Sequence, residues 1–373
     1  MIVFVHLLND RSGSPHVLCS TMAALIPNAS GAHLFVGSDG SGCLDDVSVP
    51  TTRYWYWRSP YRLLTLFTYV VSQLCLLVQL FRSRDIDRDA LIYVNTLLPF
   101  GAALYGWLTG RPVVYHLHEV SVSPAPLKWF LTGIARLTAR GLIYVSDFHR
   151  GSLPISGVPA ATVHNALDAL FLVRAAANSY QHRYGHEDCF NVLMLASLRD
   201  YKGVPEFLAL TKGLSLRSDI HFDLVLNDDA PALQHYFRAT DVPRNLTLHS
   251  RTDDPAHHYA QASLVLNLSR PDLCVETFGL TLLEAMAFGV PVIAPPVGGP
   301  TELVSQGVEG FLIDCRHGDE LKEKVLQLAD DEALCQKMSA AARRRSERFN
   351  PYAFAQGLRK ALAFQVPEKC SAP

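Results

Sequence analysis

Short apolar runs of strand length alternate with stretches of helix-forming residues along much of the chain. In the first half the apolar runs lie at 90–94, 112–116 and 142–146, and stretches typical of helices lie between them at 99–109 and 127–139. Strands that alternate with helices in this way form parallel sheets covered by helices. The pattern predicts an α/β fold of the doubly wound, Rossmann-like kind.

The same alternation continues through the second half. The apolar run 263–268 predicts a strand, the helix formers at 280–288 predict a helix, and the β-branched run 290–294 predicts the next strand. A chain of 373 residues, of which 49% are hydrophobic, is long enough to bury two cores, so we expect two domains. A polar, irregular run at 174–188 is the expected linker between them.

The expected division of the chain has three parts. We place an amino-terminal domain at 1–172, a carboxyl-terminal domain at 173–350, and a final helix with a frayed tail at 351–373. The three arginines at 343–345 precede that last part and are expected to cover a solvated helix face, with a contact to acidic lipid as the alternative.

The longest apolar run, 63–81, has the length of a membrane span. Five of its 19 residues are Thr, Ser or Gln. Because a polar stripe suits a helix with one side in water, we expect a packed helix of the first domain. The aromatic and arginine-rich run before it, RYWYWRSPYR at 53–62, keeps contact with a membrane surface open as the alternative, beside an acceptor cleft with stacking surfaces. Four of the polar residues form the stripe, namely Thr65, Thr68, Ser72 and Gln79.

The net charge, the cysteines and the first residues of the chain indicate which classes of protein to expect. The formal net charge of −2 gives no reason to expect nucleic-acid binding. Eight cysteines without a CxxC pair or a Cys/His cluster are typical of reduced thiols. The first residues, MIVFVHLLND, lack a basic segment and a cleavage-site pattern, so we expect a first strand rather than a signal peptide. We expect a cytoplasmic protein, with any membrane contact at the inner face of the cytoplasmic membrane.

Two acidic residues, Glu276 and Glu284, flank the predicted start of a helix. Glu276 follows a strand at its carboxyl end, where open α/β sheets bind ligands, and Glu284 lies about one turn into the helix. The backbone N–H groups near Phe278, Gly279 and Leu280 point out of that helix end and predict an anion site. A phosphate between two acids makes sense if the acids bind hydroxyl groups, which indicates a sugar nucleotide. The alternative is a surface acid at 276 and a helix-dipole partner at 284.

Cations and a histidine lie at two other strand ends. Arg199 and Lys202 precede a helix that starts near Val204, so two positive charges and a helix amino end converge where a diphosphate would fit. Elsewhere such a pair is usually solvated surface charge. His118 and Glu119 lie just past the carboxyl end of the strand 112–116, although a loop histidine is more often structural or exposed.

These motifs resemble a known family. The segment from Glu276, with ETFG, LLEAMAFGVPVIA and the Gly298-Gly299 pair, resembles the E-x7-E signature of retaining glycosyltransferases, especially glycosyltransferase family 4 (group 1). RDYKG at 199–203 is similar to the family's Arg-x-x-Lys-Gly, and TVHNALD at 162–168 resembles the Asn-x-x-Asp segment that closes its first domain. By residue type alone, Asn165 and Asp168 also suit turns and helix caps.

The resemblance implies a GT-B fold, with two Rossmann-like domains facing an interdomain cleft and a final helix that crosses back to the first domain. It implies that Arg199 and Lys202 bind the donor diphosphate and stabilise it as it leaves. It further implies that Glu276 holds sugar hydroxyl groups and that Glu284 binds the ribose. Phe278, Gly279 and Leu280 are the accompanying donor-binding positions.

The resemblance also implies roles in the first domain. His118 faces the transferred sugar, with His116 as its near competitor, and the loop at Gly13 approaches the donor phosphate or the acceptor. The family's usual pair of glycines is missing there, because Ser12 precedes Gly13. No DxD element lies in a suitable loop and no His/Cys ligand set indicates a metal. The family resemblance also implies a metal-independent reaction without a cofactor.

We therefore expect a retaining hexosyltransferase that uses a UDP- or GDP-linked sugar. The expected acceptor is a glycan or a lipid-linked oligosaccharide for surface polysaccharide such as O-antigen, capsule or exopolysaccharide. The alternatives are a GT-B nucleotide-sugar epimerase and a non-catalytic two-lobed protein that binds sugar nucleotides. The loops after strands 222–226 and 246–249 depart from the family pattern, with Arg251 in the second loop, and leave the base open.

Overall fold

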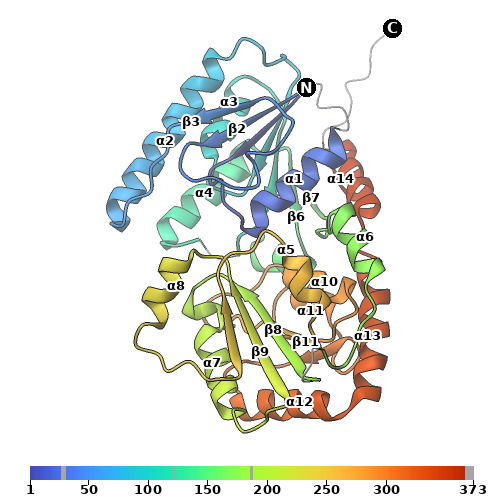
Figure 1. The fold of residues 1–373 in the computed structure, drawn as a ribbon. Coiled ribbons are helices and arrows are strands. Elements are labelled where there is room, and N and C mark those ends of the chain that lie inside the picture. The colour runs from blue at the N-terminus through green and yellow to red at the C-terminus, as the bar shows by residue number, and fades with distance from the viewer. Residues whose placement is uncertain (27–30, 121, 185–187, 366–373) are drawn as a thin grey trace. The chain divides into compact units, whose positions relative to one another are not determined.

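The computed structural model describes residues 1–365 except 27–30, 121 and 185–187. The chain divides into two compact units, one formed by Met1–Ala166 with the segment from Pro351 and the other by Leu167–Asn350. Each unit is a parallel β-sheet covered by helices (Figure 1). The predicted α/β class with two doubly wound sheets is thereby confirmed.

The first unit has seven strands in the order β3-β2-β1-β4-β5-β6-β7. Every neighbouring pair is parallel, and chain order reverses between β1 and β4, the point where doubly wound sheets bind ligands. The strands are β1 (Ile2–His6), β2 (Ala32–Gly37), β3 (Thr51–Tyr54), β4 (Leu91–Asn95), β5 (Val113–Leu117), β6 (Gly141–Tyr144) and β7 (Ala160–Thr162). The helices are α1 (Gly13–Leu25), α2 (Arg62–Arg82), α3 (Phe100–Leu108), α4 (Ala125–Thr138), α5 (Asp147–Ser152) and α14 (Pro351–Gln365).

The second unit has six parallel strands in the order β10-β9-β8-β11-β12-β13, with the reversal between β8 and β11. The strands are β8 (Phe190–Ala196), β9 (Ile220–Leu226), β10 (Leu246–His249), β11 (Leu264–Leu266), β12 (Val292–Ala294) and β13 (Gly310–Leu312). The helices are α6 (Ala169–Ala177), the short 3-10 helix η1 (Asp200–Lys202), α7 (Val204–Gly213), α8 (Ala230–Phe237), α9 (Pro255–Ala260), α10 (Leu280–Ala287), α11 (Pro300–Leu303), α12 (Gly318–Asp330) and α13 (Glu332–Ser346).

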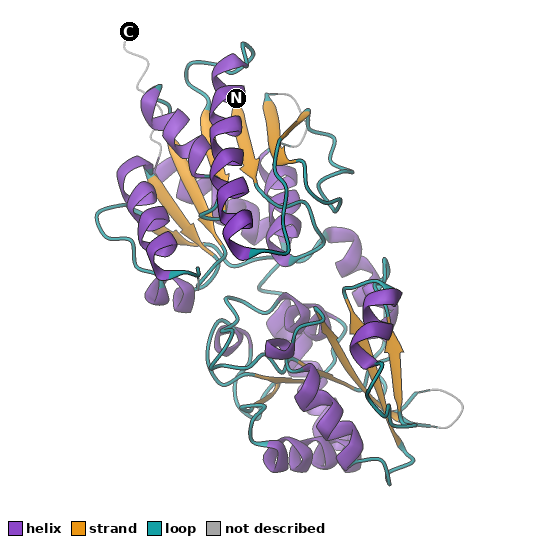
Figure 2. Cartoon of the chain, turned by 90° about the vertical axis from the view of Figure 1, so that its left-hand side faces the viewer, coloured by secondary structure: helices purple, strands orange, loops and turns teal. Residues whose placement is uncertain are grey.

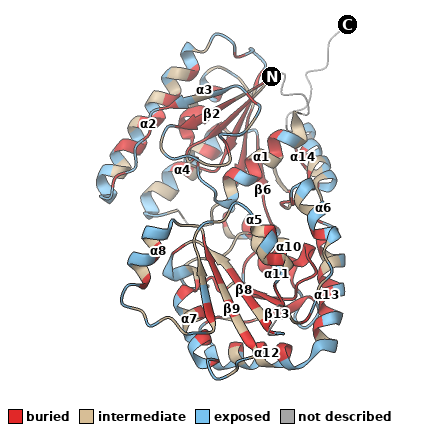
Figure 3. Ribbon diagram, in the orientation of Figure 1, coloured by how far each residue is buried: buried red, intermediate tan, exposed pale blue. Residues whose placement is uncertain are grey.

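Each unit has its own hydrophobic core along the two faces of its sheet, which fits the apolar runs that predicted the strands (Figure 3). Strands buried on both faces are continuously apolar rather than alternating. In the second unit, for example, Phe207 of α7 meets Phe222 of β9 edge to face, with ring centroids 5.6 Å apart. Burial of this kind contributes most of the favourable free energy of folding.

Helix α2 is oriented opposite to our expectation. The polar residues Thr68, Ser72 and Gln73 are 3%, 0% and 1% exposed, so the central part of the polar side faces the protein interior. Their partners explain this burial: Thr68 Oγ1 donates to the Trp57 carbonyl at 2.7 Å, and Gln73 Oε1 accepts from the Gly101 amide at 3.1 Å. The prediction of a packed helix was right, whereas the prediction that its polar stripe faces water was wrong for this central part. By length and composition alone α2 is long and apolar enough to cross a membrane.

The segment around the predicted domain boundary is helical. The boundary at 172/173 falls inside α6, and part of the expected irregular linker is therefore helix; residues 185–187 of that linker lie outside the described residues. Asp168 caps α6, since its Oδ1 accepts from the amide of Leu170 at 2.8 Å. Helix α14 packs on α1, and Arg359 donates to the Ala24 carbonyl at 3.0 Å.

The start of α1 differs from our expectation, and the cysteines are described only in part. Helix α1 begins at Gly13, so the glycine that we expected in a loop is the first residue of the helix. The described cysteines are free thiols, while Cys370 and the tail 366–373 lie outside the described residues.

The arginines at 343–345 do not simply cover a solvated face. Arg343 donates to the carbonyl oxygens of Ala175, Asn178 and Phe288 at 3.1, 2.9 and 2.9 Å, and thereby ties α6 and the end of α10 to α13. Arg345 donates to the carbonyls of Glu302 and Leu303. Arg344 is exposed, whereas Arg343 and Arg345 are half-buried.

We expect Arg343→Ala to lower the free energy of unfolding by about 2–4 kcal/mol, because three partly buried carbonyl groups lose a charged donor. Arg344→Ala is the matched control and should change it by less than about 0.5 kcal/mol. Urea unfolding followed by circular dichroism measures both. Equal effects of the two substitutions would contradict the role of Arg343.

Candidate functional site

The loop from β11 to α10 carries the predicted acids. Gly279, with φ of 101°, precedes α10 and is followed by Leu280 as the first helical residue. The Gly298-Gly299 pair lies directly under this loop, because the Gly299 amide donates to the Glu276 carbonyl at 2.9 Å. A Cβ atom on Gly299 would lie 2.2 Å from the Thr277 carbonyl oxygen, so no larger residue fits there. The glycine pair thus fixes the backbone that carries Glu276.

Glu276 forms an ion pair with Lys202. Lys202 Nζ lies 2.5 Å from Glu276 Oε1, and Ser269 Oγ donates to the same oxygen at 2.7 Å. Burial alone would raise the pKa of Glu276, but the charge of Lys202 and the hydrogen bonds from Lys202 and Ser269 outweigh it, so its pKa lies below the ordinary range. In the same way, burial would lower the pKa of Lys202, but Glu276 holds it above the ordinary value. Both groups are therefore charged at neutral pH.

The local backbone explains how Lys202 reaches this position. The chain leaves β8, forms the single turn η1, and enters α7 through Gly203, whose φ is 83°. A Cβ atom on Gly203 would lie 2.2 Å from the Leu268 carbonyl oxygen, so the segment packs closely on the chain that follows β11. The Arg270 amide also donates to the Tyr201 carbonyl at 2.9 Å. These contacts bring Lys202 to Glu276 although the two are 74 residues apart.

Arg199 differs from Lys202 in being exposed. Its guanidinium donates to the Leu198 carbonyl at 3.3 Å, and none of the described acidic side chains pairs with it. A cation without an acidic partner, held at the carboxyl end of a central strand, remains available to an anion.

Glu284 lies in the second turn of α10 and meets a residue that the sequence did not reveal. Tyr259 of α9 donates its hydroxyl proton to Glu284 Oε2 at 2.6 Å. Burial raises the pKa of Glu284 to about 7, and the hydrogen bond from Tyr259 partly opposes this rise. Near neutral pH the carboxyl group is thus divided between its charged and neutral forms.

The predicted anion site at the start of α10 involves backbone rather than side chains. The Phe278 ring is 2% exposed and packs against Phe349, with centroids 5.8 Å apart, so it belongs to the core. The amides at Leu280 and Thr281 begin the helix, where the intrahelical pattern leaves N–H groups without a carbonyl acceptor. Such a helix end favours a negative charge.

In the first unit, His118 binds Asn95, which lies at the carboxyl end of β4 beside the reversal of strand order. The Asn95 amide nitrogen donates to the Ser14 carbonyl at 3.1 Å and lies 3.1 Å from His6 Nδ1. This orientation turns Asn95 Oδ1 toward His118 Nε2, 2.9 Å away. An amide oxygen can only accept, so His118 carries its proton on Nε2 and leaves Nδ1 as its acceptor.

The surrounding histidines are neutral. Burial lowers the pKa of His6 to about 4, of His116 to about 3 and of His149 to about 4, and it lowers the pKa of His118 well below its ordinary value. His116, the competitor of His118, is fully buried and bonded to the Tyr93 hydroxyl at 2.9 Å. His118 is the less buried of the two and the better placed to meet a ligand.

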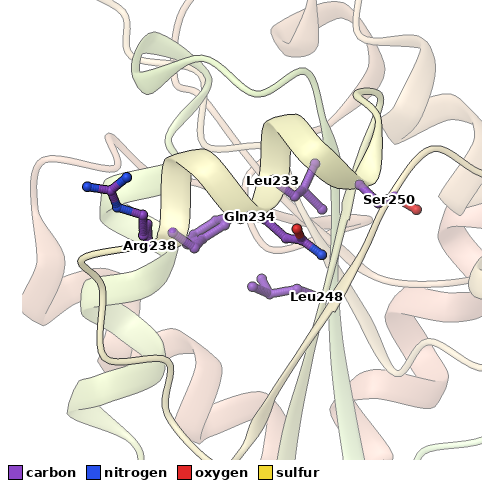
Figure 4. A pocket seen from close by; sticks show the side chains of 7 residues that line it. Leu233, Gln234, Arg238, Leu248 and Ser250 are labelled. Carbon is purple, nitrogen blue, oxygen red and sulfur yellow. The ribbon is translucent and has the colours of Figure 1, made fainter.

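A groove of about 400 Å³ lies apart from these residues, between α8 and β10 (Figure 4). Leu233 and Gln234 of α8 and Arg238 directly after it line the groove, together with Leu248 of β10 and Ser250. It contains none of the predicted donor-binding residues. Near it, Arg251 donates to Asn227 Oδ1 at 3.2 Å, so this exposed arginine is held on the loop after β9.

The predicted residues thus fall into two groups. In the second unit, the structure brings Glu276 and Lys202 into contact, whereas Arg199 points to no described acid and Glu284 pairs with Tyr259. In the first unit, Gly13 begins α1 and His118 is joined through Asn95 to Ser14, the next residue after Gly13. Ser269, Tyr259 and Asn95 were missed; only Asn95 had a signal, as a polar residue that ends an apolar strand at a central position.

Comparison with known proteins agrees with these motifs. Residues 181–345 match the family model of glycosyl transferases group 1. The N-acetyl-alpha-D-glucosaminyl L-malate synthase of Bacillus anthracis is 29% identical over 190 residues, which cover 49% of this chain and 47% of that protein. A sucrose synthase of Denitrovibrio acetiphilus is 50% identical over 52 residues, 14% of this chain and 7% of that protein. The chain therefore spans less than half the length of these curated relatives.

A similar fold is present in a solved structure that covers almost the whole chain. The crystal structure of Anabaena Alr3699/HepE in complex with UDP has a TM-score of 0.76 and 20% sequence identity, and the match covers 97% of this chain and 99% of that one. The chain thus has the GT-B fold that the motifs implied, with one Rossmann-like sheet in each unit.

We expect the free energy of unfolding to depend on pH through the ionisation of Glu284. Its pKa in the folded protein lies above the value in an unfolded chain, so its contribution to stability is complete below about pH 4.5 and is lost as the pH rises through about 7. Relative to Glu284→Gln, the wild type should lose roughly 3 kcal/mol over that range. Unfolding by urea at several pH values measures the difference. A difference that stays constant with pH would contradict the raised pKa.

Tyr259→Phe provides a second test of the same pair. Because the tyrosine hydroxyl stabilises the carboxylate, its removal should move the midpoint of that pH dependence upward.

We expect that in Asn95→Ala the His118 ring no longer carries its proton on Nε2 alone. In the wild type, nitrogen chemical shifts of labelled histidine should show the proton on Nε2, and the variant should show a mixture with the Nδ1 form. Asn191→Ala, which removes a side-chain hydrogen bond to the Gln261 carbonyl in the second unit, is the control and should leave His118 unchanged. An unaltered tautomer in Asn95→Ala would show that Asn95 does not orient the ring.

Proposed function

From the match of residues 181–345 to the family model of glycosyl transferases group 1, we propose that the chain is a retaining glycosyltransferase. It moves a sugar from a nucleoside-diphosphate sugar to an acceptor hydroxyl group. The observation that carries the proposal is the charged Lys202–Glu276 pair beside the amino end of α10, at the carboxyl end of the sheet. This arrangement offers binding groups for a diphosphate and for sugar hydroxyls side by side.

The first requirement of the reaction is stabilisation of the leaving group. As the bond between the anomeric carbon and the diphosphate oxygen breaks, negative charge develops on the diphosphate. Lys202, Arg199 and the amides at Gly279 and Leu280 supply fixed positive potential for it, and such preorganised electrostatics are usually the largest catalytic term. These groups stabilise the leaving diphosphate without a metal ion or a cofactor, and the proposed reaction uses neither.

Glu276 has two roles in this proposal. One oxygen already holds Lys202 and Ser269, so the carboxylate is fixed in orientation before the donor binds. The carboxylate then accepts hydrogen bonds from sugar hydroxyls and lies near the positive charge that develops on the sugar ring. Because burial is offset by its partners, Glu276 is charged at neutral pH, as both roles require.

Glu284 and Tyr259 would hold the ribose. A carboxylate accepts from two neighbouring hydroxyl groups, and Tyr259 keeps Glu284 in place. We assign a UDP- or GDP-linked sugar as donor, with UDP favoured by the UDP complex of the Anabaena protein. We also assign to His118 a contact with hydroxyl groups of the transferred sugar, for which its neutral ring offers Nδ1 as an acceptor.

The acceptor in this proposal is a lipid-linked oligosaccharide used for surface polysaccharide. Exposed aromatic side chains of the first unit, including Trp55, Trp57 and Tyr61, support an acceptor that is partly sugar and partly apolar. Placement at the cytoplasmic side of a membrane, with peripheral contact, would give access to such a substrate.

Substitution of Glu276 tests the site. We expect Glu276→Gln to lower kcat for sugar transfer by about a hundredfold or more, because the charge near the sugar and the partner of Lys202 are both lost. Asp272→Asn, which removes an exposed carboxylate four residues earlier, is the control and should change kcat by less than about twofold. The assay incubates the protein with labelled UDP and GDP sugars and lipid-linked oligosaccharides, and proton NMR identifies the anomer formed.

Other outcomes point to other functions. Conversion of the donor without any acceptor would favour an epimerase, and tight binding with neither transfer nor slow hydrolysis would favour a binding protein. Full activity of a folded Glu276→Gln variant would overturn the site assignment.

A further inference from the structure

Helix α2 exposes a continuous apolar stripe. Leu63 is 83% exposed and Phe67 is 64% exposed, and the stripe continues over the whole length of the helix at intervals of three and four residues. This spacing places its members on one side of the helix. Figure 3 shows exposed positions along α2, from its beginning to its end. The stripe consists of Leu63, Phe67, Val70, Leu74, Val78 and Phe81.

The folding of the first unit does not account for this stripe. Thr68, Ser72 and Gln73 occupy the side of α2 that faces the core, and their hydrogen bonds are satisfied there. The helix therefore buries polar groups together with Tyr69, Leu76 and Leu80, and leaves an apolar stripe outside, whereas a helix on the surface of a soluble domain usually turns polar residues outward. Exposed apolar patches of this extent mark contacts with a partner or a membrane.

Two neighbouring helices extend the apolar face. Phe100 of α3 packs edge to face against Tyr69 of α2 and against Phe130 of α4, with centroids 5.8 and 5.2 Å apart. The three helices thus lie side by side, as Figures 1 and 2 also show. On α4, Trp129 is 81% exposed, and on α3, Trp107 is 49% exposed. We call the exposed side of α2, α3 and α4 the helical face.

The charge of the helical face has one sign. No Asp or Glu occurs in α2, α3 or α4, and none occurs anywhere between Asp46 and Asp85. Arg62 and Arg82 lie at the two ends of α2, and Arg136 lies on α4; all three are exposed. The helical face carries arginine and exposed tryptophan but no carboxylate. Such a surface suits the interface of a lipid bilayer with negatively charged head groups.

We propose that the helical face docks on the surface of an anionic lipid bilayer. The apolar stripe of α2 and the Trp129 side chain enter the boundary between head groups and acyl chains, while the arginines contact acidic head groups. Like charge on both partners disfavours pairing of this face with a second copy of the chain. Helix α2 lies on the membrane and does not cross it, because Thr68 and Gln73 are bonded to the rest of the first unit.

Co-sedimentation of the full chain with vesicles tests the proposal, without any sugar nucleotide present. Vesicles of phosphatidylcholine with about 30 mol% phosphatidylglycerol should bind the protein, and binding should weaken as salt is raised. Leu63→Ser combined with Phe67→Ser should lower the partition coefficient by about tenfold or more, since two apolar side chains no longer enter the bilayer. Both residues are exposed, so the fold should tolerate the change.

A matched control and a charge variant complete the design. Leu216→Ser combined with Val308→Ser replaces two exposed apolar residues of the second unit and should leave binding unchanged. Arg62→Glu combined with Arg136→Glu should weaken binding to anionic vesicles much more than to pure phosphatidylcholine.

Three results would overturn the proposal: no binding of the wild type to anionic vesicles, equal binding of the wild type and the Leu63/Phe67 variant, or a lipid-free dimer in sedimentation velocity that this variant abolishes. Because binding is measured without donor or acceptor, failure here is distinguishable from failure of the proposed transferase activity.

Discussion

The ion pair between Lys202 and Glu276 is the interaction on which the candidate site of the second unit depends. A charge taken out of water is stable only when a partner and hydrogen bonds compensate it, and here Lys202, Glu276 and Ser269 satisfy one another. The pair forms because β8 and β11 are neighbours at the reversal of strand order, so that the loops after them meet. Close approach of those loops requires glycine at 203, and glycine at 299 lets the loop after β12 pack on the segment that carries Glu276. Motifs far apart in the sequence are thus parts of one packing arrangement.

The first unit follows a different electrostatic principle. Its strand-end cluster contains His6, His116, His118 and His149, all with pKa values lowered by burial, so it holds no cation at neutral pH. Hydrogen bonds rather than charges set its geometry, and Asn95 is central because it binds His118, His6 and the Ser14 carbonyl at once. Such a cluster suits the orientation of uncharged hydroxyl groups, whereas Arg199, Lys202 and the amino end of α10 in the second unit suit an anion.

The sequence predicted the strands and helices that follow from local patterns of residues. It did not predict which way a helix or side chain faces where that depends on tertiary contacts. Apolar runs predicted the strands, and chain order predicted that Glu276, Lys202 and His118 follow strand ends, as they do in the structure. Tyr259 carried no such signal, since it reaches Glu284 from a different helix. Arg343 was taken as a surface charge because its three carbonyl partners belong to segments distant in sequence. The ends of helices also shifted, as the start of α1 at Gly13 shows.

Helix α2 shows the limit of pattern analysis most clearly. Its periodicity correctly indicates a polar and an apolar side, but periodicity contains no information about which side the rest of the protein covers. Burial of Thr68 and Gln73 is tolerated only because the Trp57 carbonyl and the Gly101 amide bond to them, which removes the usual penalty for buried polar groups. The exposure of Leu63 and Phe67 still lowers the stability of the fold, because an apolar side chain left in water does not contribute the free energy of burial. Cover of the outer side of α2 by an apolar phase would remove this cost, so the proposed docking of the helical face follows from how α2 is hydrogen-bonded inside the unit.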